Sequence, residues 1–240
     1  MPNPVISDFD SDTCCVAKKK GVGVNRYIPS SECIEIRSKP AYDKRTNVRC
    51  IRIDGYCLGL NTHEGKYEVR LDIVWQAFKQ MIWMLQKYKR LCQIRLETPT
   101  FISESECSKF RRAFKQLIEM LKRHYTTAKV GYLYVREKSS NRGWHYHVVL
   151  WIDGKKCNSG HVAWELWNQI LWKAELLTKM NKDEKLNELR KVESKLVNLR
   201  DQKTLFDATY GWSYLAKPRT KGRGAARSRD FVVSQVSANR

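Results

Sequence analysis

The feature that most constrains this chain is a pair of strand-like segments separated by a short polar loop. Residues 131–137 have the composition of a strand, residues 143–152 are rich in Val, Leu, Ile, Trp and Tyr, and the polar loop between them ends in Gly143. This pattern predicts two antiparallel strands joined as a hairpin. His145 and His147 are spaced i, i+2 in the second strand, so their side chains project from the same face.

A carboxylate joins these two histidines if Glu137 pairs opposite His145 across the hairpin. Residues directly opposite one another in an antiparallel pair point the same way, so Glu137, His145 and His147 would converge on one point. Two imidazoles and a carboxylate are typical ligands of a divalent metal ion. The alternative is a pair of structural histidines that are satisfied by backbone carbonyl groups.

A second group of chemically active side chains lies near the C-terminus. Tyr210, Tyr214 and Lys217 are spaced i, i+4, i+7, which places them along one face if this segment is helical. Tyrosines on one helix face also occur in hydrophobic cores, so both interpretations remain open. Pro218 disfavours a helical conformation at the preceding residue, so we expect the helix to end at Lys217.

An upstream acidic residue, a His-hydrophobic-His strand and a C-terminal Tyr-x-x-Lys helix, in that order, resemble the HUH endonucleases that start rolling-circle DNA replication. The segment 213–217 with the basic residues after it looks more narrowly like the replication initiators of filamentous phages, the inoviruses. The resemblance covers residues 91–229. It implies that Glu137, His145 and His147 hold Mn²⁺ or Mg²⁺, and that Tyr214 is the nucleophile, assisted by Lys217. Tyr210 would be either a second nucleophile or a core residue.

The resemblance also implies an activity, which is nicking of single-stranded DNA at a replication origin. The product would be a 5′-phosphotyrosine link and a free 3′-OH that a host polymerase extends, with a host helicase as a further partner. Two alternatives remain open. One is a basic DNA-binding regulator without catalysis, and the other is a metal-dependent nuclease or hydrolase that forms no covalent intermediate.

The composition favours a polyanionic partner. The net charge of +20 and a pI near 9.7 attract phosphate-bearing ligands, of which nucleic acid is the first candidate. Trp144 and Tyr146, as exposed aromatic side chains beside the histidines, would suit unpaired bases. The basic residues expected to contact DNA are Arg142, Arg219, Lys221, Arg223, Arg227 and Arg229.

The location and the cysteine chemistry can also be predicted. No segment approaches the roughly 20 apolar residues of a membrane span, and residues 1–8 lack the basic-then-apolar run of a secretory signal. We therefore expect no membrane association and a place in the cytoplasm of a bacterial host. The eight cysteines include no Cys-x-x-Cys pair, which indicates reduced, mostly buried thiols in that compartment.

The expected fold class is α+β, with an antiparallel HUH-type sheet of the RRM or ferredoxin-like kind. Its helices would cover one face, leaving the other for the metal and DNA. Residues 1–67 form an N-terminal arm with short strands and no assigned role, residues 68–230 the endonuclease domain, and residues 231–240 a C-terminal tail. Apolar residues at three- and four-residue steps predict an inserted amphipathic helix over residues 181–203.

Overall fold

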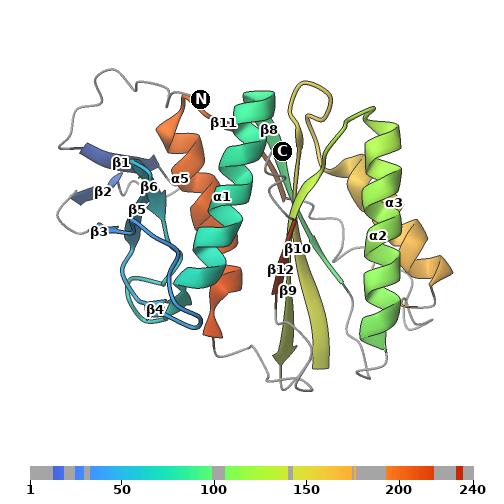
Figure 1. Ribbon diagram of the computed structural model, residues 1–240, viewed down its shortest axis with the longest axis horizontal. Coiled ribbons are helices and arrows are strands. Elements are labelled where there is room, and N and C mark those ends of the chain that lie inside the picture. The colour runs from blue at the N-terminus through green and yellow to red at the C-terminus, as the bar shows by residue number, and fades with distance from the viewer. Residues whose placement is uncertain are drawn as a thin grey trace.

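A five-stranded antiparallel sheet forms the centre of the computed structural model, which describes residues 13–18, 25–29, 33–98, 106–139, 143–174, 176, 193–218 and 231–234. The strand order is β11-β8-β10-β9-β12, and the sheet is seen nearly edge-on in Figure 1. The bounds are Arg90–Glu97 for β8, Gly131–Ser139 for β9, Gly143–Asp153 for β10, Glu193–Asn198 for β11 and Phe231–Val233 for β12. The predicted hairpin is therefore β9–β10, at the middle of the sheet.

Helices cover both faces of this sheet (Figure 1). Helices α2 (Glu106–His124) and α3 (His161–Lys173) lie on one side, and α1 (Leu71–Tyr88) and α5 (Gln202–Ser213) on the other, where the short 3₁₀ helix η2 (Tyr214–Ala216) continues α5. The α+β class is confirmed, but the expectation of helices on one face only is wrong. Strand β10 explains the difference, because Val148 and Leu150 are buried on one face while Val149 and Trp151 are buried on the other.

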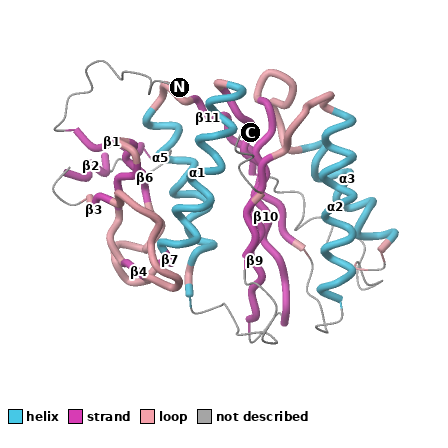
Figure 2. Tube along the Cα trace, viewed as in Figure 1, coloured by secondary structure: helices cyan, strands magenta, loops and turns pink. Residues whose placement is uncertain are grey.

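Short strands before α1 form a second layer beside α1 and α5, as Figure 2 shows. Strands β3 (Ile34–Glu35), β5 (Cys50–Ile53) and β6 (Tyr56–Gly59) make a three-stranded sheet, β4 (Arg45–Thr46) pairs with β7 (Val69–Arg70), and β1 (Thr13–Lys18) pairs with β2 (Asn25–Pro29). Asp54 and Gly55 have φ values of 51° and 80°, which makes a tight turn between β5 and β6.

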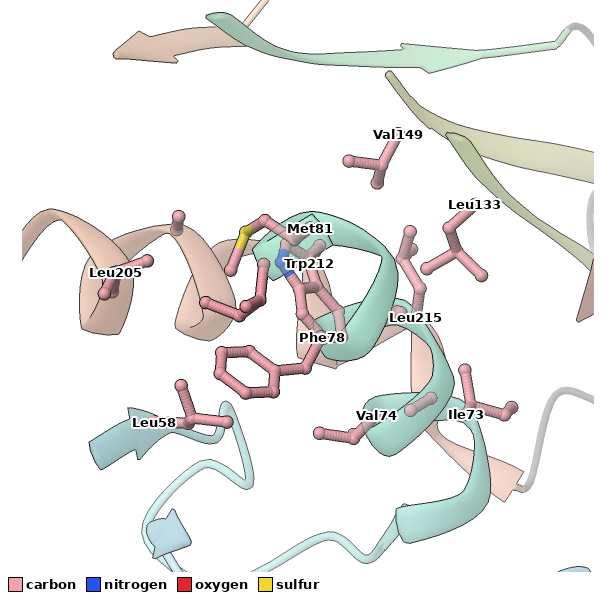
Figure 3. Packing of buried hydrophobic residues seen from close by; sticks show 14 of the residues in the cluster. Leu58, Ile73, Val74, Phe78, Met81, Leu133, Val149, Leu205, Trp212 and Leu215 are labelled. Carbon is pink, nitrogen blue, oxygen red and sulfur yellow. The ribbon is translucent and has the colours of Figure 1, made fainter. Parts of the chain in front are cut away.

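The larger of the hydrophobic cores joins these N-terminal strands to the central sheet (Figure 3). Leu58 of β6, Phe78 of α1, Leu205 of α5 and Val149 of β10 all belong to one buried cluster. Residues 50–69 therefore contribute to the same core as the central sheet. Among the helices that the structure describes, none has both the length and the apolar run needed to cross a bilayer.

The helix predicted over residues 181–203 is wrong at residues 193–198, and residues 202–203 begin helix α5. Residues 193–198 form strand β11, which pairs with β8 and extends the sheet; residues 177–192 lie outside the described part of the chain. This pairing gives the backbone of β8 a hydrogen-bonding partner on that side. The spacing of apolar residues within 181–203 could not predict it, because the pairing depends on a strand far away in the sequence. The predicted C-terminal tail likewise starts at a strand, because Phe231–Val233 pairs with β9.

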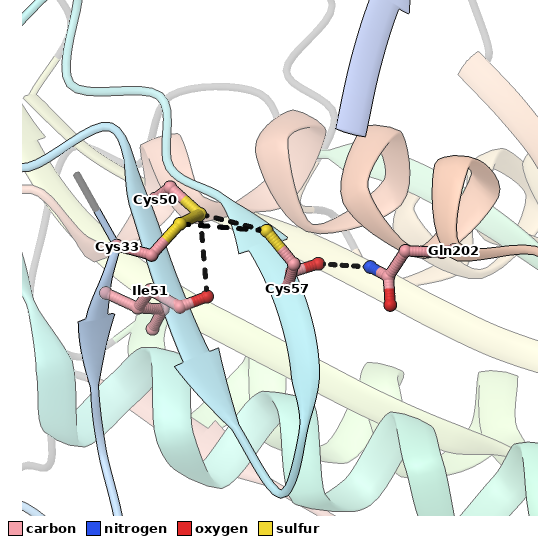
Figure 4. Close-up of a disulfide and its surroundings, with 5 residues drawn as sticks. All are labelled: Cys33, Cys50, Ile51, Cys57 and Gln202. Atoms are coloured by element: carbon pink, nitrogen blue, oxygen red, sulfur yellow. Dashed lines mark hydrogen bonds between the residues drawn. A yellow bond between two sulfur atoms is a disulfide. The ribbon is translucent and has the colours of Figure 1, made fainter. Parts of the chain in front are cut away.

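The expectation about the cysteines holds for two of those described. Cys92 and Cys157 are buried thiols outside any disulfide. Cys33 and Cys50, by contrast, are joined in a disulfide (Figure 4), so the prediction of reduced thiols is wrong there. These two residues are 17 positions apart in the sequence, and only the folding of the N-terminal strands brings them together.

Candidate active site

The β9–β10 register brings the predicted metal ligands to one face. His145 pairs directly with Glu137, and His147 pairs with Val135 on one side and with Glu97 of β8 on the other. The predicted pairing of Glu137 with His145 is therefore confirmed. Because side chains alternate along a strand, all these ligands share the face on which α1 and α5 pack.

Four side chains form a compact cluster on this face. Oε2 of Glu137 lies 3.4 Å from Nε2 of His147 and 3.7 Å from Nε2 of His145, and Oε2 of Glu97 lies 3.6 Å from Nδ1 of His147. The ligand atoms of Glu97, His145 and His147 all lie within 4.8 Å of one another. Glu137 and both histidines are each 5% exposed, whereas the Glu97 side chain is 36% exposed, so Glu97 stands at the solvent edge.

The cluster fits a divalent metal ion. Nδ1 of His147 is buried and has no hydrogen-bond partner among the described residues. A buried polar atom without a partner costs about 1–3 kcal/mol. Glu97 Oε2, 3.6 Å away, would remove this cost by accepting a hydrogen bond from Nδ1–H of a His147 ring whose Nε2 atom holds an ion. Two imidazoles with the carboxylate of Glu97, and that of Glu137 close to both rings, are donors suited to several divalent ions, so the arrangement supports a metal centre without selecting the metal.

Helix α5, which leads to the predicted tyrosine nucleophile, is fixed over the same face of the sheet. It begins after Asp201, whose side chain accepts hydrogen bonds from two backbone N–H groups of the first turn. Gln93 of β8 donates to the carbonyl of Ala208 at 3.4 Å and accepts from the Trp151 indole at 3.0 Å. The rings of Trp151 and Trp212 also meet edge to face, so strand β10 and helix α5 pack directly against each other.

The end of α5 places a lysine against Tyr214. The helix gives way to η2 at Tyr214, and Lys217 has an extended conformation (φ −63°, ψ 130°) before Pro218, so the predicted helix end is confirmed. Nζ of Lys217 lies 3.6 Å from the centroid of the Tyr214 ring and 4.2 Å from that of Tyr67. Since Lys217 is only 3% exposed, this cation is buried between two phenol rings.

Tyr210 lies one turn before Tyr214 and is 37% exposed. The interpretation of Tyr210 as a core residue is therefore wrong. Figure 1 shows that the η2 end of α5 and the hairpin end of β9 and β10 lie at the same, lower end of the molecule. Helix α1 contacts η2 and both strands of the hairpin, so the same helix packs against the element that carries Tyr214 and against the strands that carry the histidines and Glu137.

The aromatic residues expected beside the histidines face the other way. Tyr146 is buried and stacks on Phe110 of α2, with ring centroids 3.6 Å apart, so the expectation that it is exposed is wrong. Trp144 has the same strand parity as Tyr146 and is half-buried, with Arg136 at 4.4 Å and Lys138 at 5.3 Å from its ring centroid. Because side chains alternate along a strand, the two residues that flank His145 must point to the face opposite the histidines.

The other residues predicted to contact DNA are all basic. They lie outside the described residues and are Arg142, Arg219, Lys221, Arg223, Arg227 and Arg229. A cavity of about 460 Å³ lies elsewhere, beside α1, α2 and β9, and its lining includes Arg111, Lys115, Lys122 and Lys129. None of its lining residues belongs to the metal cluster or to the tyrosine end.

Two residues of the site were missed in the sequence. Glu97 is the last residue of β8, and the pairing of β8 with β10 is needed to bring it to His147. Tyr67 precedes α1 and reaches Lys217 only through the fold. The strand parity of Glu97 was the one available signal, because Gln93, Arg95 and Glu97 alternate with apolar residues.

The sheet, the carboxylate–imidazole cluster and the tyrosine helix together define an α+β protein with a candidate metal centre. The model of the family described as replication-associated protein ORF2/G2P matches residues 96–218, about half of the chain. The chain therefore belongs to this replication-associated protein family. The matched segment runs from just before Glu97 to just after Lys217. It contains both histidines and both carboxylates of the cluster, Tyr210, Tyr214 and Lys217, but not Tyr67. No curated protein and no solved structure matched the chain.

Proposed function

We propose that this protein is an endonuclease that nicks single-stranded DNA at an origin and so starts rolling-circle replication, as the inovirus initiators that it resembles do. The observation that supports this most strongly is the metal-type cluster on the same sheet face as the helix that leads to Tyr214. Both parts lie in the segment that matches the replication-associated family. A replication role also suits the +20 charge, because binding to phosphates releases condensed counterions.

In this proposal Glu137 and the Nε2 atoms of His145 and His147 hold Mn²⁺ or Mg²⁺. The Nε2 atoms of His145 and His147 both lie close to Oε2 of Glu137, which favours this ligand set. Glu97 approaches the other nitrogen of His147 and would orient that ring. When bound, the ion supplies Lewis-acid stabilisation of the negative charge that develops on the phosphate oxygens.

Tyr214 would attack the scissile phosphorus with its phenolic oxygen. The phenol gives up its proton to water as its oxygen bonds to the 5′-phosphate. The P–O3′ bond breaks, and the departing oxygen takes up a proton to become a free 3′-OH. The buried cation of Lys217, 3.6 Å from the ring centroid, would stabilise the negative charge on the phenol oxygen during this step. Exposed Tyr210 would be available for a second transfer.

The free 3′-OH defines the partners of the reaction. A host polymerase would extend it and a host helicase would separate the strands, which places the reaction in the bacterial cytoplasm. We propose residues 68–230 as the catalytic unit, with the strands of residues 33–67 supporting α5.

A covalent-adduct assay tests the proposal. Purified protein is incubated with Mn²⁺ and a random-sequence, single-stranded DNA library labelled at the 3′ end, then denatured and separated by size. The proposal predicts labelled protein that survives denaturation and disappears after nuclease digestion. DNA binding without cleavage would indicate a regulator, and cleavage with no labelled protein would indicate a nuclease that uses water.

A further inference from the structure

The cavity of about 460 Å³ lies at the edge of the central sheet, between helices that cover its two faces. The first residues of β9 line it, together with Gln80 and Trp83 of α1 and one side of α2. Ser234, just after β12, also lines it and exchanges two hydrogen bonds of 2.9 Å with the backbone of Tyr132. Helices α1 and α2 stand on opposite sides of the sheet in Figure 1, so side chains from both faces meet here.

Aromatic side chains from α2 and β9 form one wall of the cavity. Phe114 meets the rings of Tyr132 and Tyr134 edge to face, with centroids 5.0 Å and 5.1 Å away, and the two tyrosine rings are nearly parallel. Trp83 of α1 lines the cavity as well and is half-buried. Aromatic rings stack on the faces of unpaired nucleobases, so this aromatic wall suits a flat heterocycle.

Cationic side chains outnumber acidic ones around the same cavity. The only carboxylate among the lining residues is that of Glu119, and the cations are Arg111, Lys115, Lys122 and Lys129. Nζ of Lys122 lies 2.8 Å from Oε1 of Glu119, so this lysine is already paired. Arg111 and Lys115 are exposed and one turn apart on α2, where a phosphate between them would accept charge-assisted hydrogen bonds.

A buried amide completes the lining. Gln80 is 2% exposed, and its Oε1 atom has no hydrogen-bond partner among the described residues. The terminal torsion of a glutamine is broad, so a rotation presents this oxygen to the cavity. A buried acceptor without a donor is unfavourable, and the amino groups of adenine, cytosine and guanine are donors of the kind that it lacks.

We propose that this cavity binds a nucleoside phosphate, with the base on the aromatic wall and the phosphate on Arg111 and Lys115. The volume falls within the range of small-molecule sites, about 300–1,000 Å³. The ligand is a free nucleotide or one nucleotide of a single strand. The second source rests on the proposed function and gives the DNA a further contact, apart from the metal cluster and Tyr214.

Calorimetric titration with dAMP tests the proposal. The full chain is titrated with a chelator present, so that cleavage plays no part. We expect binding that weakens with salt and that the double variant Arg111→Ala, Lys115→Ala weakens roughly tenfold or more. The matched control is Lys109→Ala, Arg112→Ala, which removes the same charge from exposed positions of α2 outside the cavity. Its affinity should stay within about twofold, because solvent and salt screen distant charges.

An end-labelled oligodeoxyadenylate distinguishes the two sources of the nucleotide. Binding of dAMP that the cavity variant weakens identifies a site for free nucleotides. If dAMP does not bind, a loss of oligonucleotide affinity in the cavity variant, measured by fluorescence anisotropy, assigns the cavity to the strand. If the cavity variant and the control have the same affinity for both ligands, the proposal is wrong.

Gln80→Leu separates a nucleotide site from a simple anion site. It removes the amide and should weaken binding of the adenine ligand roughly fivefold, while leaving the affinity for inorganic phosphate unchanged. Inorganic phosphate that binds as tightly as dAMP, with no effect of Gln80→Leu on either, would contradict recognition of the base.

Photocrosslinking requires no variant to fold. The chain is irradiated with 8-azidoadenine, supplied as the free nucleotide and within a single strand, and the crosslinked peptides are mapped by mass spectrometry. The proposal predicts adducts on peptides that contain Trp83, Tyr132 or Tyr134. Adducts confined to other peptides would overturn it. Since a chelator is present throughout, these results are independent of whether the chain nicks DNA.

Discussion

The two halves of the candidate active site are held in place by different kinds of contact. Glu137 and His145 face each other across one hairpin, so their geometry follows from the register of β9 and β10. The tyrosine end depends on residues far away in the chain, because the Ser213 hydroxyl accepts a hydrogen bond from the backbone N–H of Asn61 and Lys217 reaches Tyr67. Changes in the N-terminal region should therefore affect the chemistry of Tyr214 while leaving metal binding intact.

The largest effect should come from breaking the hairpin half. Replacing His145 or His147 by alanine removes an imidazole ligand and should lower Mn²⁺-dependent cleavage by roughly 10³-fold or more. Affinity for single-stranded DNA should change little, because phosphate contacts supply most of it. Cleavage rates, calorimetric Mn²⁺ titration and fluorescence anisotropy with DNA separate these effects. Mn²⁺-dependent cleavage by the double-alanine variant would refute the metal assignment.

A comparison of the two carboxylates sharpens the ligand set within the same half. Glu137 is buried between both Nε2 atoms, whereas Glu97 is more exposed and approaches only Nδ1 of His147. Glu97→Gln should weaken Mn²⁺ binding by about 10- to 100-fold, as loss of an orienting partner does, and Glu137→Gln should weaken it more. Isothermal titration at fixed pH measures both. A larger loss with Glu97→Gln would exchange the two roles.

Removal of the buried cation tests the tyrosine half. Lys217→Ala should slow single-turnover cleavage by roughly 10- to 100-fold, less than the loss of a direct donor to the transition state, because the metal still acts. Mn²⁺ affinity should remain unchanged. Lys203→Ala, on the exposed first turn of α5, is the matched control and should cleave normally. If Lys217→Ala weakened Mn²⁺ binding as strongly as cleavage, the two halves would not be separate.

The smallest effect should follow loss of a single long-range hydrogen bond. Ser213→Ala removes the acceptor for the Asn61 N–H, at 2.9 Å, and should lower the free energy of unfolding by about 1–2 kcal/mol. Urea denaturation measures this, and Thr204→Ala, which removes a hydroxyl near the start of the same helix, serves as the comparison. A reduced rate of adduct formation should accompany Ser213→Ala and not Thr204→Ala. If both variants formed the adduct at the same rate, the hydrogen bond from Asn61 would have no role in positioning Tyr214.

The difference between local and long-range contacts explains which features the sequence could predict. The hairpin, its register and the parity of Glu137, His145 and His147 depend on neighbours along the chain, so residue spacing was sufficient. The end of the helical segment α5–η2 just before Lys217 followed from the conformational restriction that Pro218 imposes. In each case the physical constraint acts within about ten residues.

The features that the sequence did not predict depend on contacts between segments that lie far apart in the chain. Glu97 joins the cluster only because β8 pairs with β10, and residues 193–198 form a strand because β8 offers them a hydrogen-bonding edge. Tyr146 was expected at the surface, but its face of β10 is covered by α2. Helical spacing, charge and aromatic content describe one segment at a time, so they could not show which faces another element would cover.

Peptide mapping of the protein–DNA adduct tests the central claim most directly. The adduct formed with Mn²⁺ is digested with protease and nuclease, and the modified peptide is sequenced by mass spectrometry. The account predicts a nucleotide 5′-phosphate on Tyr214, an adduct that Tyr214→Phe eliminates, and an adduct that Tyr210→Phe retains. A nucleotide on Tyr210 would reverse the assignment of the nucleophile. A nucleotide on neither tyrosine would contradict the proposed mechanism.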